Sequence, residues 1–407
     1  MYTELHPELA YQSDAKKAKD IIQACVHCGF CTATCPTYQH FNDERDGPRG
    51  RIYLIKQLLE TNQASEKTQL HLDRCLTCRS CETTCPSGVE YGRLVDIGRH
   101  MVEQKVDRGL IQKSTRWILR KILPYPSRFG RLLRIGQFFR PILPSPIKTK
   151  VPLKQKTGLW PTRSHARKML LLRGCAQPSA TPNTNAAAAR VFDRLDITLI
   201  EEPQAGCCGA VDYHLSAHEA ALNAMRKNID AWWPTIEAGA EAIVTTASGC
   251  GAMVQEYGEK LAHDPEYAHK AAQVSMLVCD ISEVLLKEDL SILKVTEQAL
   301  ETAFHCPCTL QHGMQLSGKV EEILEQVGVP LTATKNSHLC CGSAGTYSIL
   351  QSDTSQKLLQ NKLSDLMIES PQQIVTANVG CQLHLYTKST VPVKHWIELL
   401  DHKDFQP

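Results

Sequence analysis

The chain has 407 residues, enough for two or three domains with separate hydrophobic cores. Its 43% hydrophobic and 22% charged residues are ordinary for a soluble globular protein, and its net charge of +2 excludes few classes of partner. Neither a signal peptide nor a run of the roughly 18 apolar residues that cross a bilayer is recognisable, so we expect no secretion and no membrane span.

The 18 cysteines are the unusual part of the composition. They stand in tight groups, in a chain too large to need a disulfide scaffold. Such groups predict metal binding in a reducing compartment rather than cross-links in an oxidising one. We therefore expect a cytoplasmic protein.

The first ninety residues contain one cysteine pattern twice. The pattern C-x2-C-x2-C-x3-C-P begins at Cys25 and recurs fifty residues later at Cys75. In bacterial two-cluster ferredoxins, three cysteines of each run hold one [4Fe–4S] cluster and the fourth ligates the other. Two [4Fe–4S] clusters with exchanged ligands are therefore predicted. Cluster 1 takes Cys25, Cys28, Cys31 and Cys85, and cluster 2 takes Cys75, Cys78, Cys81 and Cys35.

A structural zinc site is the alternative, since it also uses C-x2-C pairs, but it leaves the third cysteine of each run unexplained. Helical apolar spacing over 50–60 and 91–105 completes a predicted ferredoxin-type domain at residues 1–105. Arg49 and Arg51 either offset the charge of the clusters or simply belong to a turn and a helix start.

Residues 106–160 are predicted to form a basic, proline-rich linker. Residues 108–192 contain 18 Lys and Arg and no Asp or Glu, whereas the rest of the chain has 27 basic and 43 acidic residues. Apolar residues are interleaved with the basic ones from Trp117 to Leu143, which favours an amphipathic surface for an anionic membrane or an acidic partner over nucleic-acid binding.

A basic face docked on this chain's own acidic domains fits the same pattern at least as well. We expect no nucleic-acid partner. Any membrane contact is expected to be peripheral, on the cytoplasmic face of the inner membrane.

The C-terminal part alternates short apolar strands with helices, which predicts α/β units with parallel strands. It is also duplicated, because Cys175, Cys207 and Cys208 each recur 133 residues later. Two repeats are predicted, at 161–295 and 296–407. Strands are expected at 168–172, 197–200, 242–246, 303–305, 330–334 and 374–377, and helices at 183–195, 214–238, 319–327 and 352–369.

Each repeat places cysteines after its strands, where α/β proteins build their sites, and Gly209 and Gly342 would allow tight turns beside them. A further metal or redox site is one interpretation, and buried inert thiols are the other. His305 and Cys306 are weaker candidates, and Cys279 is expected to be a core thiol. The cysteines of this candidate site are Cys175, Cys207, Cys208, Cys250, Cys308, Cys340, Cys341 and Cys381.

The repeats resemble the CCG domain of heterodisulfide reductase and related proteins, whose cysteines hold an unusual iron–sulfur centre. That family ends each repeat in a C-x2-C pair, whereas Met253 and His384 stand at the fifth position here. This departure argues against a five-cysteine centre and leaves one conventional cluster, or none, open.

The order of parts resembles the iron–sulfur subunits of bacterial glycolate oxidase, in stretches such as ACVHCGFCTATCPTYQ, DGPRGRIYLIKQ, AGCCGAVDYHL and SHLCCGSAGTY. The resemblance implies an α+β multidomain fold, with an N-terminal α-helical ferredoxin domain followed by two α/β CCG-type repeats. It implies a complex whose flavin subunits oxidise glycolate to glyoxylate, an oxidoreductase acting on CH–OH with an acceptor other than NAD or O2. This chain would relay the electrons to a quinone or another acceptor.

The chain shows no dinucleotide-binding or phosphate-loop motif of its own, so hydride chemistry is expected in a flavin-containing partner and no catalytic residue is predicted here. Equivalent subunits of lactate or glycerol-3-phosphate dehydrogenases share the architecture and remain alternatives. A heterodisulfide-reductase-like thiol redox enzyme is a further alternative, against which the missing C-x2-C endings argue.

Overall fold

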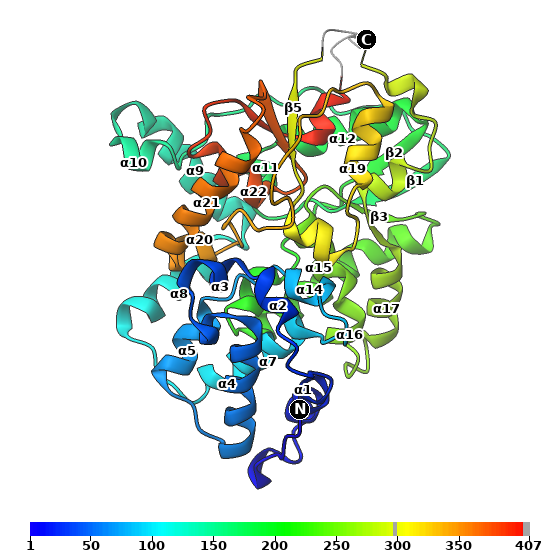
Figure 1. Ribbon diagram of the computed structural model, residues 1–407. Helices are drawn as coiled ribbons and strands as arrows, with labels where there is room; N and C mark the ends of the chain where they lie inside the picture. Colours follow the sequence, from blue (N-terminus) through cyan, green and yellow to red (C-terminus); the bar gives the residue numbers. More distant parts are fainter. Residues whose placement is uncertain (296–298, 402–407) are drawn as a thin grey trace. The chain divides into compact units, whose positions relative to one another are not determined.

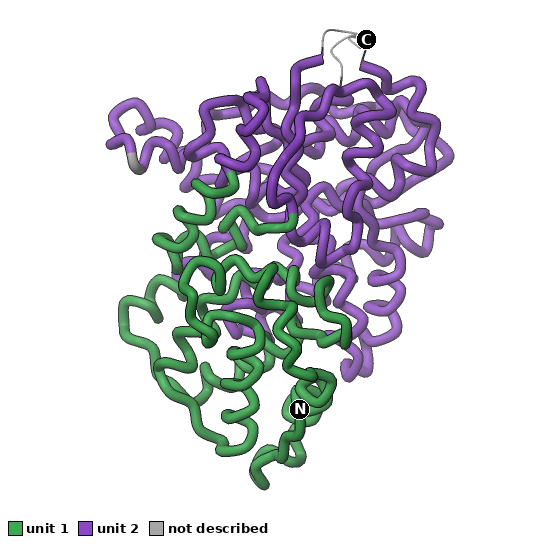
Figure 2. Tube along the Cα trace, viewed as in Figure 1, with its two compact units in different colours: residues 1–117, 338–362 green, residues 118–337, 363–407 purple. Residues whose placement is uncertain are grey.

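The computed structural model describes residues 1–295 and 299–401, and the chain divides into two compact units. Unit 1 contains residues 1–117 and 338–362, and unit 2 contains residues 118–337 and 363–407 (Figure 2). Unit 1 therefore includes a loop and helical segment from the second cysteine repeat. The four-part division expected from the sequence follows composition and repeats rather than packing, and it stays a prediction.

Unit 1 is built from helices (Figure 1). Apolar residues of the four longest N-terminal helices form one core. Pro48 starts one of them with a fixed φ, and Ser65 caps another by accepting a hydrogen bond from the Thr68 N–H. The helices are α1 (Ser13–Gln23), α2 (Phe30–Ala33), α3 (Pro36–Phe41), α4 (Pro48–Thr61), α5 (Glu66–Asp73), α6 (Ser80–Thr83), α7 (Tyr91–Glu103), α20 (Tyr347–Leu350) and the first part of α21 (Ser352–Leu366).

The helices predicted at 50–60 and 91–105 are confirmed as α4 and α7. Their apolar faces meet in the unit 1 core, where Ile55, Leu58 and Leu94 are fully buried. Periodicity is a reliable signal here because one face of each helix is buried along its whole length.

The basic segment is also helical, in α8 (Leu110–Ile122), α9 (Pro126–Phe139) and α10 (Ser145–Lys148). Within unit 2, α9 packs against α11 (Gln177–Ala180) at Gly130. A Cβ atom at Gly130 would lie 2.5 Å from the Ser179 hydroxyl, so a larger residue would require the serine side chain to move. The opposite side of α9 is exposed, which matters for the proposal on docking below.

Unit 2 contains two all-parallel sheets flanked by helices (Figure 1). The first sheet has the order β2-β1-β3-β4 and the second the order β5-β6-β7. A single apolar cluster contains residues of both sheets, such as Leu171 and Val375. The strands are β1 (Arg167–Leu171), β2 (Ile197–Ile200), β3 (Ile243–Thr245), β4 (Val278–Asp280), β5 (Thr302–His305), β6 (Gln373–Thr376) and β7 (Val393–His395).

The helices of unit 2 lie between and after these strands. The helix expected at 214–238 is confirmed as one long helix that begins at His218, and a separate short helix ends at His214. Those not yet bounded are α12 (Asn183–Arg194), α13 (Ala210–His214), α14 (His218–Glu237), α15 (Ser248–Gln255), α16 (Tyr257–Lys260), α17 (Ala268–Leu277), α18 (Ile281–Leu285), α19 (Lys319–Gln326) and α22 (Val379–Tyr386).

The duplication predicted from the cysteines is confirmed in the topology. In the first sheet, β1 pairs with β3, and β3 pairs with the short strand β4. In the second sheet, β5 pairs with β6, and β6 pairs with the short strand β7. Each last strand leads into a capping box, formed by Asp280 with Glu283 in the first repeat and by His395 with Glu398 in the second. The fold class inferred from the resemblance, α+β with a helical ferredoxin part and two α/β repeats, is confirmed.

Two expectations about strands need correction. The strand predicted at 330–334 is wrong, because only Leu331 bridges to Thr302 at the sheet edge, where Pro330 has no N–H to donate. The strands β4 and β7 were not predicted. Each has three residues and includes a charged one, so neither forms the continuous apolar run that indicated β3 at 242–246.

Candidate metal centres

The four cysteines predicted for cluster 1 line one cavity of unit 1. Three of them lie in the loop and helix before α3, and the fourth, Cys85, follows α6 in the second cysteine run. Cys28 is exposed and the other three are partly exposed. Ile52 and Val89 provide apolar wall, and Arg49 reaches the cavity from α4.

The four cysteines predicted for cluster 2 line a second cavity of the same unit. Here Cys35, Cys75 and Cys81 are buried and Cys78 is partly exposed. Cys81 and Tyr91 border both cavities, so the two sites are neighbours. The chain thus brings together the two crossed sets expected from the sequence, while their ligation of iron stays a prediction.

The two cysteine loops repeat the same backbone conformation. Left-handed φ angles occur at His27 and Gly29 in the first loop, and at Thr77 and Arg79 in the second. Left-handed residues inside a turn direct successive N–H groups into one concavity, which is a feature of anion and iron–sulfur sites. In the second loop the Thr77 N–H already points at a sulfur, 3.4 Å from Cys75 Sγ.

The cysteines of each set disfavour one another's ionisation. Burial, followed by the neighbouring Cys25, raises the pKa of Cys31 to about 11, and burial followed by Cys78 raises the pKa of Cys81. Several thiolates can share such a space only around a cation, because a metal takes the deprotonated form of the ligand. Two sets of four thiols beside inward-facing amides fit two iron–sulfur clusters. Such clusters supply one-electron transfer when bound.

A buried polar network lies beside the cluster 2 cavity, and only its arginine was singled out from the sequence. Arg51 is fully buried and donates to the His71 carbonyl at 2.7 Å and to Thr37 Oγ1 at 3.2 Å. Thr37 Oγ1 lies 3.3 Å from Cys35 Sγ. The buried Asp46 pairs with Arg74 at 2.8 Å.

Asp43, Asp46 and His71 also lie close enough to share a metal ion. Their carboxylates are engaged by arginines instead, Asp43 by Arg45 at 2.7 Å and Asp46 by Arg74. The arginine hydrogen bonds lower the pKa of Asp43 below its ordinary value, as expected for an ion pair. This group therefore functions as a charge network.

The first repeat brings its four cysteines into contact in unit 2. Hydrogen bonds between thiols link Cys175 to Cys207, Cys207 to Cys208, and Cys208 to Cys250. As the acceptor of two of these bonds, Cys207 has a pKa below its ordinary value, whereas the donors Cys175 and Cys208 have raised pKa values. A thiol whose pKa is lowered by its hydrogen-bonded neighbours suits metal binding or redox chemistry.

Buried polar groups hold the first Cys-Cys-Gly turn in place. Asn228 accepts from the Gly206 N–H and donates to the Cys207 carbonyl, both at 2.8 Å, and Tyr257 donates to the Cys208 carbonyl at 2.9 Å. Gly209 has a φ of +91°, and a Cβ there would lie 3.1 Å from a backbone oxygen. The sequence-based role of this glycine in a tight turn is confirmed.

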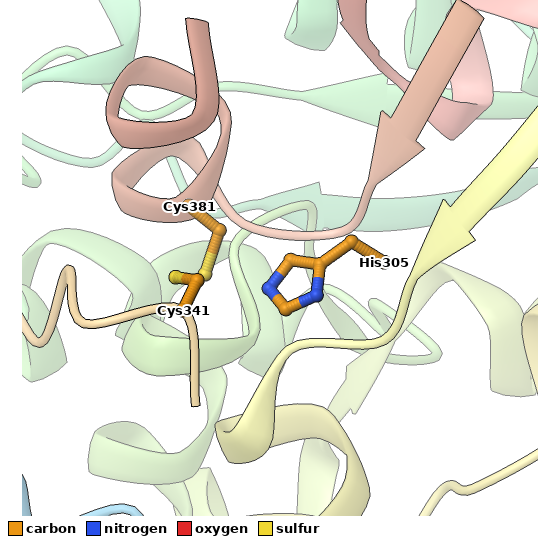
Figure 3. Close-up of side chains that lie close together, drawn as sticks. All are labelled: His305, Cys341 and Cys381. Atoms are coloured by element: carbon orange, nitrogen blue, oxygen red, sulfur yellow. The ribbon is translucent and has the colours of Figure 1, made fainter. Parts of the chain in front are cut away.

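In the second repeat, His305 and Cys381 of unit 2 present ligand atoms within 4.8 Å of each other (Figure 3). Both side chains are buried, as is Cys341 of unit 1, and His305 stands at the end of β5. The histidine was only a weak candidate from the sequence, where its position beside Cys308 gave no indication of its neighbours. Cys340 is buried and Cys308 is partly exposed.

The remaining candidate residues of the repeats are buried or packed against the core of unit 2. Met253 and His384, at the fifth positions of the repeats, are both buried. Cys306 belongs to the large apolar core of unit 2, and Cys279 packs against it. Burial raises the pKa of Cys279 to about 12, which agrees with the expectation of an inert core thiol.

Comparison with known proteins agrees with this arrangement. Residues 21–89 match a family model described as "4Fe-4S dicluster domain", and residues 169–255 and 302–386 match "Cysteine-rich domain". The chain is 54% identical over 402 residues to the glycolate oxidase iron-sulfur subunit of Escherichia coli, covering 98% of both chains. The chain belongs to the family of glycolate oxidase iron–sulfur subunits.

Other similar proteins are more distant. The probable glycolate oxidase iron-sulfur subunit of Bacillus subtilis is 29% identical, over 89% of this chain and 87% of its own. Lactate utilization protein A of Shouchella clausii is 24% identical, over 49% of this chain and 83% of its own. Family membership makes this chain an iron–sulfur protein and a subunit of an oxidoreductase complex with other subunits.

Proposed function

We propose that this chain is the electron relay of a glycolate-oxidising complex, in which it carries two [4Fe–4S] clusters. The observation that carries the proposal is the pair of neighbouring cavities in unit 1, each lined by one crossed set of four cysteines. Neighbouring clusters can exchange single electrons, and the exposure of Cys28 supports a position of cluster 1 near the protein surface. An electron donor can therefore approach cluster 1 closely.

The donor in this proposal is a flavin in a partner subunit, where glycolate loses two electrons to become glyoxylate. Each electron then passes through cluster 1 and cluster 2 to a quinone or another acceptor. The supporting evidence is the 54% identity to a subunit named for glycolate oxidase and the absence of a dinucleotide-binding motif in this sequence. The cysteines of the repeats remain candidates for a further iron–sulfur centre.

A lactate-oxidising complex is the second candidate, because lactate utilization proteins match about half of this chain.

The substrate that reduces the clusters distinguishes the two candidates. In the purified complex with its partner subunits, we expect anaerobic glycolate to produce the EPR signal of reduced clusters. A Cys28→Ser variant, which disrupts cluster 1, should retain flavin reduction by glycolate but lose rapid reduction of cluster 2. Faster cluster reduction by lactate or glycerol 3-phosphate than by glycolate would contradict the proposal.

We also propose that α9 docks peripherally on an anionic membrane at the cytoplasmic face. No helix of the described chain is long and apolar enough to cross a bilayer. On α9, Leu132, Ile135 and Phe138 are 49%, 55% and 78% exposed. Arg131 and Arg134 lie one turn before Ile135 and Phe138 on the helix, so cationic and apolar groups share the exposed side.

The arginines of α8 and α9 differ in their partners, which supports assigning the docking to α9. Arg116 of α8 pairs with Asp73 at 3.1 Å, and Arg120 pairs with Asp212 at 2.8 Å. Among residues 1–295 and 299–401, Arg131 and Arg134 form no ion pair and instead donate to carbonyls of their own helix. The alternative raised from the sequence, a basic face docked on acidic parts of the same chain, therefore describes α8 better than α9.

A further inference from the structure

The two cavities of unit 1 differ in the arginine that each receives. Arg49 and Arg51 both belong to α4, and side chains two positions apart on a helix point to opposite sides. Arg49 lines the cluster 1 cavity and Arg51 lines the cluster 2 cavity. The sequence left open whether either arginine has an electrostatic role, and their surroundings now separate them.

The charge of Arg49 is largely neutralised. Its Nε lies 2.6 Å from Glu44 Oε1, and both side chains are partly exposed to solvent. A solvent-screened cation with its own carboxylate has little net field on a neighbouring cluster.

Arg51 is in the opposite situation. Its side chain is 1% exposed, and its contact with Asp46, at 3.4 Å, is the longest of the three that this carboxylate makes. Asp46 lies closer to Arg74, at 2.8 Å, and to His71, at 3.0 Å. Arg74 therefore takes up most of the negative charge of Asp46, and the guanidinium of Arg51 keeps a net positive charge.

The positive charge of Arg51 acts on the cluster 2 thiols. Arg51 lines the cluster 2 cavity together with Tyr91, Cys75 and Cys35. Thr37 links the arginine to one of these sulfurs, since its hydroxyl lies 3.2 Å from the guanidinium and 3.3 Å from Cys35 Sγ. Tyr91 O–H reaches the other, 3.7 Å from Cys75 Sγ.

Burial of cluster 2 makes such a cation necessary. Reduction adds one negative charge to a cluster, and a site with three buried cysteines stabilises that charge less than the exposed cluster 1 site. A buried, incompletely neutralised cation offsets this cost, because Coulomb interactions are strong where water is excluded. Without it, cluster 2 would be a poor acceptor for an electron arriving at cluster 1.

We propose that Arg51 selectively raises the reduction potential of cluster 2 and thereby enables it to accept electrons from cluster 1, with Asp46 setting the size of the effect. Arg51 acts on cluster 2 through its charge and does not bind iron. The inference rests on the proposed two-cluster function, and it adds that one residue, Arg51, raises the reduction potential of cluster 2.

The test is a potentiometric titration of the full reconstituted chain, with each cluster followed by EPR. In Arg51→Met, the ratio of reduced to oxidised cluster 2 at a fixed potential should fall at least about tenfold, or about 59 mV for a one-electron couple. Arg51→Lys should keep most of the wild-type ratio. Arg49→Met is the matched control from the other side of α4, and it should change cluster 1 by less than about twofold.

Asp46→Asn distinguishes charge from loosened structure. Removing this carboxylate should raise the potential of cluster 2, whereas structural damage would move Arg51→Met and Asp46→Asn in the same direction. An unchanged cluster 2 ratio in Arg51→Met, or an equal loss in Arg51→Lys, would overturn the inference. If Arg51→Met fails to incorporate iron, the sign of the Asp46→Asn shift still decides. Because these titrations use a chemical reductant, their failure is distinguishable from a failure of glycolate to reduce the complex.

Discussion

Cys35 and Cys85 connect the two cysteine runs of unit 1. Each follows its own run by a longer gap and precedes a proline, and each lies on the cavity lined by the other run. Crossed ligation therefore ties two loops that are fifty residues apart, and loss of one ligand should affect a predictable cluster.

Double variants test this crossing. Cys31→Ala and Cys85→Ala each remove a ligand of cluster 1, so each should lose about four irons, and their combination should lose no more. Cys31→Ala with Cys35→Ala removes a ligand from each cluster and should lose about eight irons. Iron and sulfide analysis with EPR measures the outcome, and Cys279→Ala, in the core of unit 2, is the control. Equal iron loss in the two double variants would contradict the crossing.

Asp280 and His395 occupy equivalent positions in the two repeats and have opposite proton linkage. Burial lowers the pKa of His395 to about 3 and raises the pKa of Asp280 to about 7. The unfolded chain binds a proton at the histidine below about pH 6.5 that the folded chain refuses, so this group destabilises the fold on acidification. Folded Asp280 keeps a proton that the unfolded chain releases above about pH 4, so its contribution to stability is lost as pH rises towards 7.

Each group changes the free energy of unfolding by about 1.4 kcal/mol per pH unit, and the two changes should nearly cancel between about pH 4 and 6.5. In Asp280→Asn only the pH dependence due to His395 should remain, so the free energy of unfolding of this variant should fall relative to wild type as pH falls from 7 to 5. In His395→Asn only the pH dependence due to Asp280 should remain, so the free energy of unfolding of this variant should rise relative to wild type over the same change in pH. Thermal unfolding at the two pH values measures both differences. Parallel pH dependence of the two variants and wild type would exclude this linkage.

At the scale of elements, α8 and α9 have similar composition but different surroundings. Exposed apolar residues and basic residues occur in both, so the sequence alone does not separate them. Long-range ion pairs hold α8 to Asp73 and Asp212, whereas α9 contacts its unit at Gly130 and leaves its arginines to solvent. Docking should therefore depend on α9.

Charge reversal on α9 tests this assignment. Arg128→Glu, Arg131→Glu and Arg134→Glu together should weaken binding of the full chain to vesicles containing anionic phosphatidylglycerol by about 100-fold, since each cation contributes about 1 kcal/mol near such a surface. Cosedimentation at low and high salt measures the effect.

The matched control carries the same change in net charge on exposed lysines of other elements, Lys67→Glu, Lys227→Glu and Lys357→Glu. It should bind almost as wild type does. Equal weakening in both triple variants would show a nonspecific charge effect. Loss of partner subunits from the α9 variant, with vesicle binding intact, would instead assign this surface to an acidic protein.

The whole molecule contains more thiols than two clusters need. Eight lie around the cavities of unit 1, and the repeats add the linked set from Cys175 to Cys250 and the group that contains His305. The departure at Met253 and His384 argues against a five-cysteine centre but leaves a four-thiol site possible.

Iron stoichiometry therefore measures the role of the repeats. About eight irons per chain would leave the repeats without a cluster, and about twelve would indicate one further cubane. Because the thiols of the first repeat form one connected set, we expect about twelve, falling to about eight in Cys208→Ala. Cys306→Ala, in the adjacent apolar core, should leave the count unchanged. A wild-type count of about eight would contradict a cluster in the repeats.

Features that depend on local or repeated sequence could be predicted before the fold was known. The spacing of the cysteine runs, the duplication of the Cys-Cys-Gly segments and the apolar periodicity of α4 and α7 are each contained in short stretches of chain. Only the folded chain shows which arginine reaches which cavity, which basic helix forms ion pairs, and that His305 lies beside Cys381. These depend on burial and on charges that approach from distant segments, and no local pattern encodes either, because packing brings such groups together only when the whole chain folds.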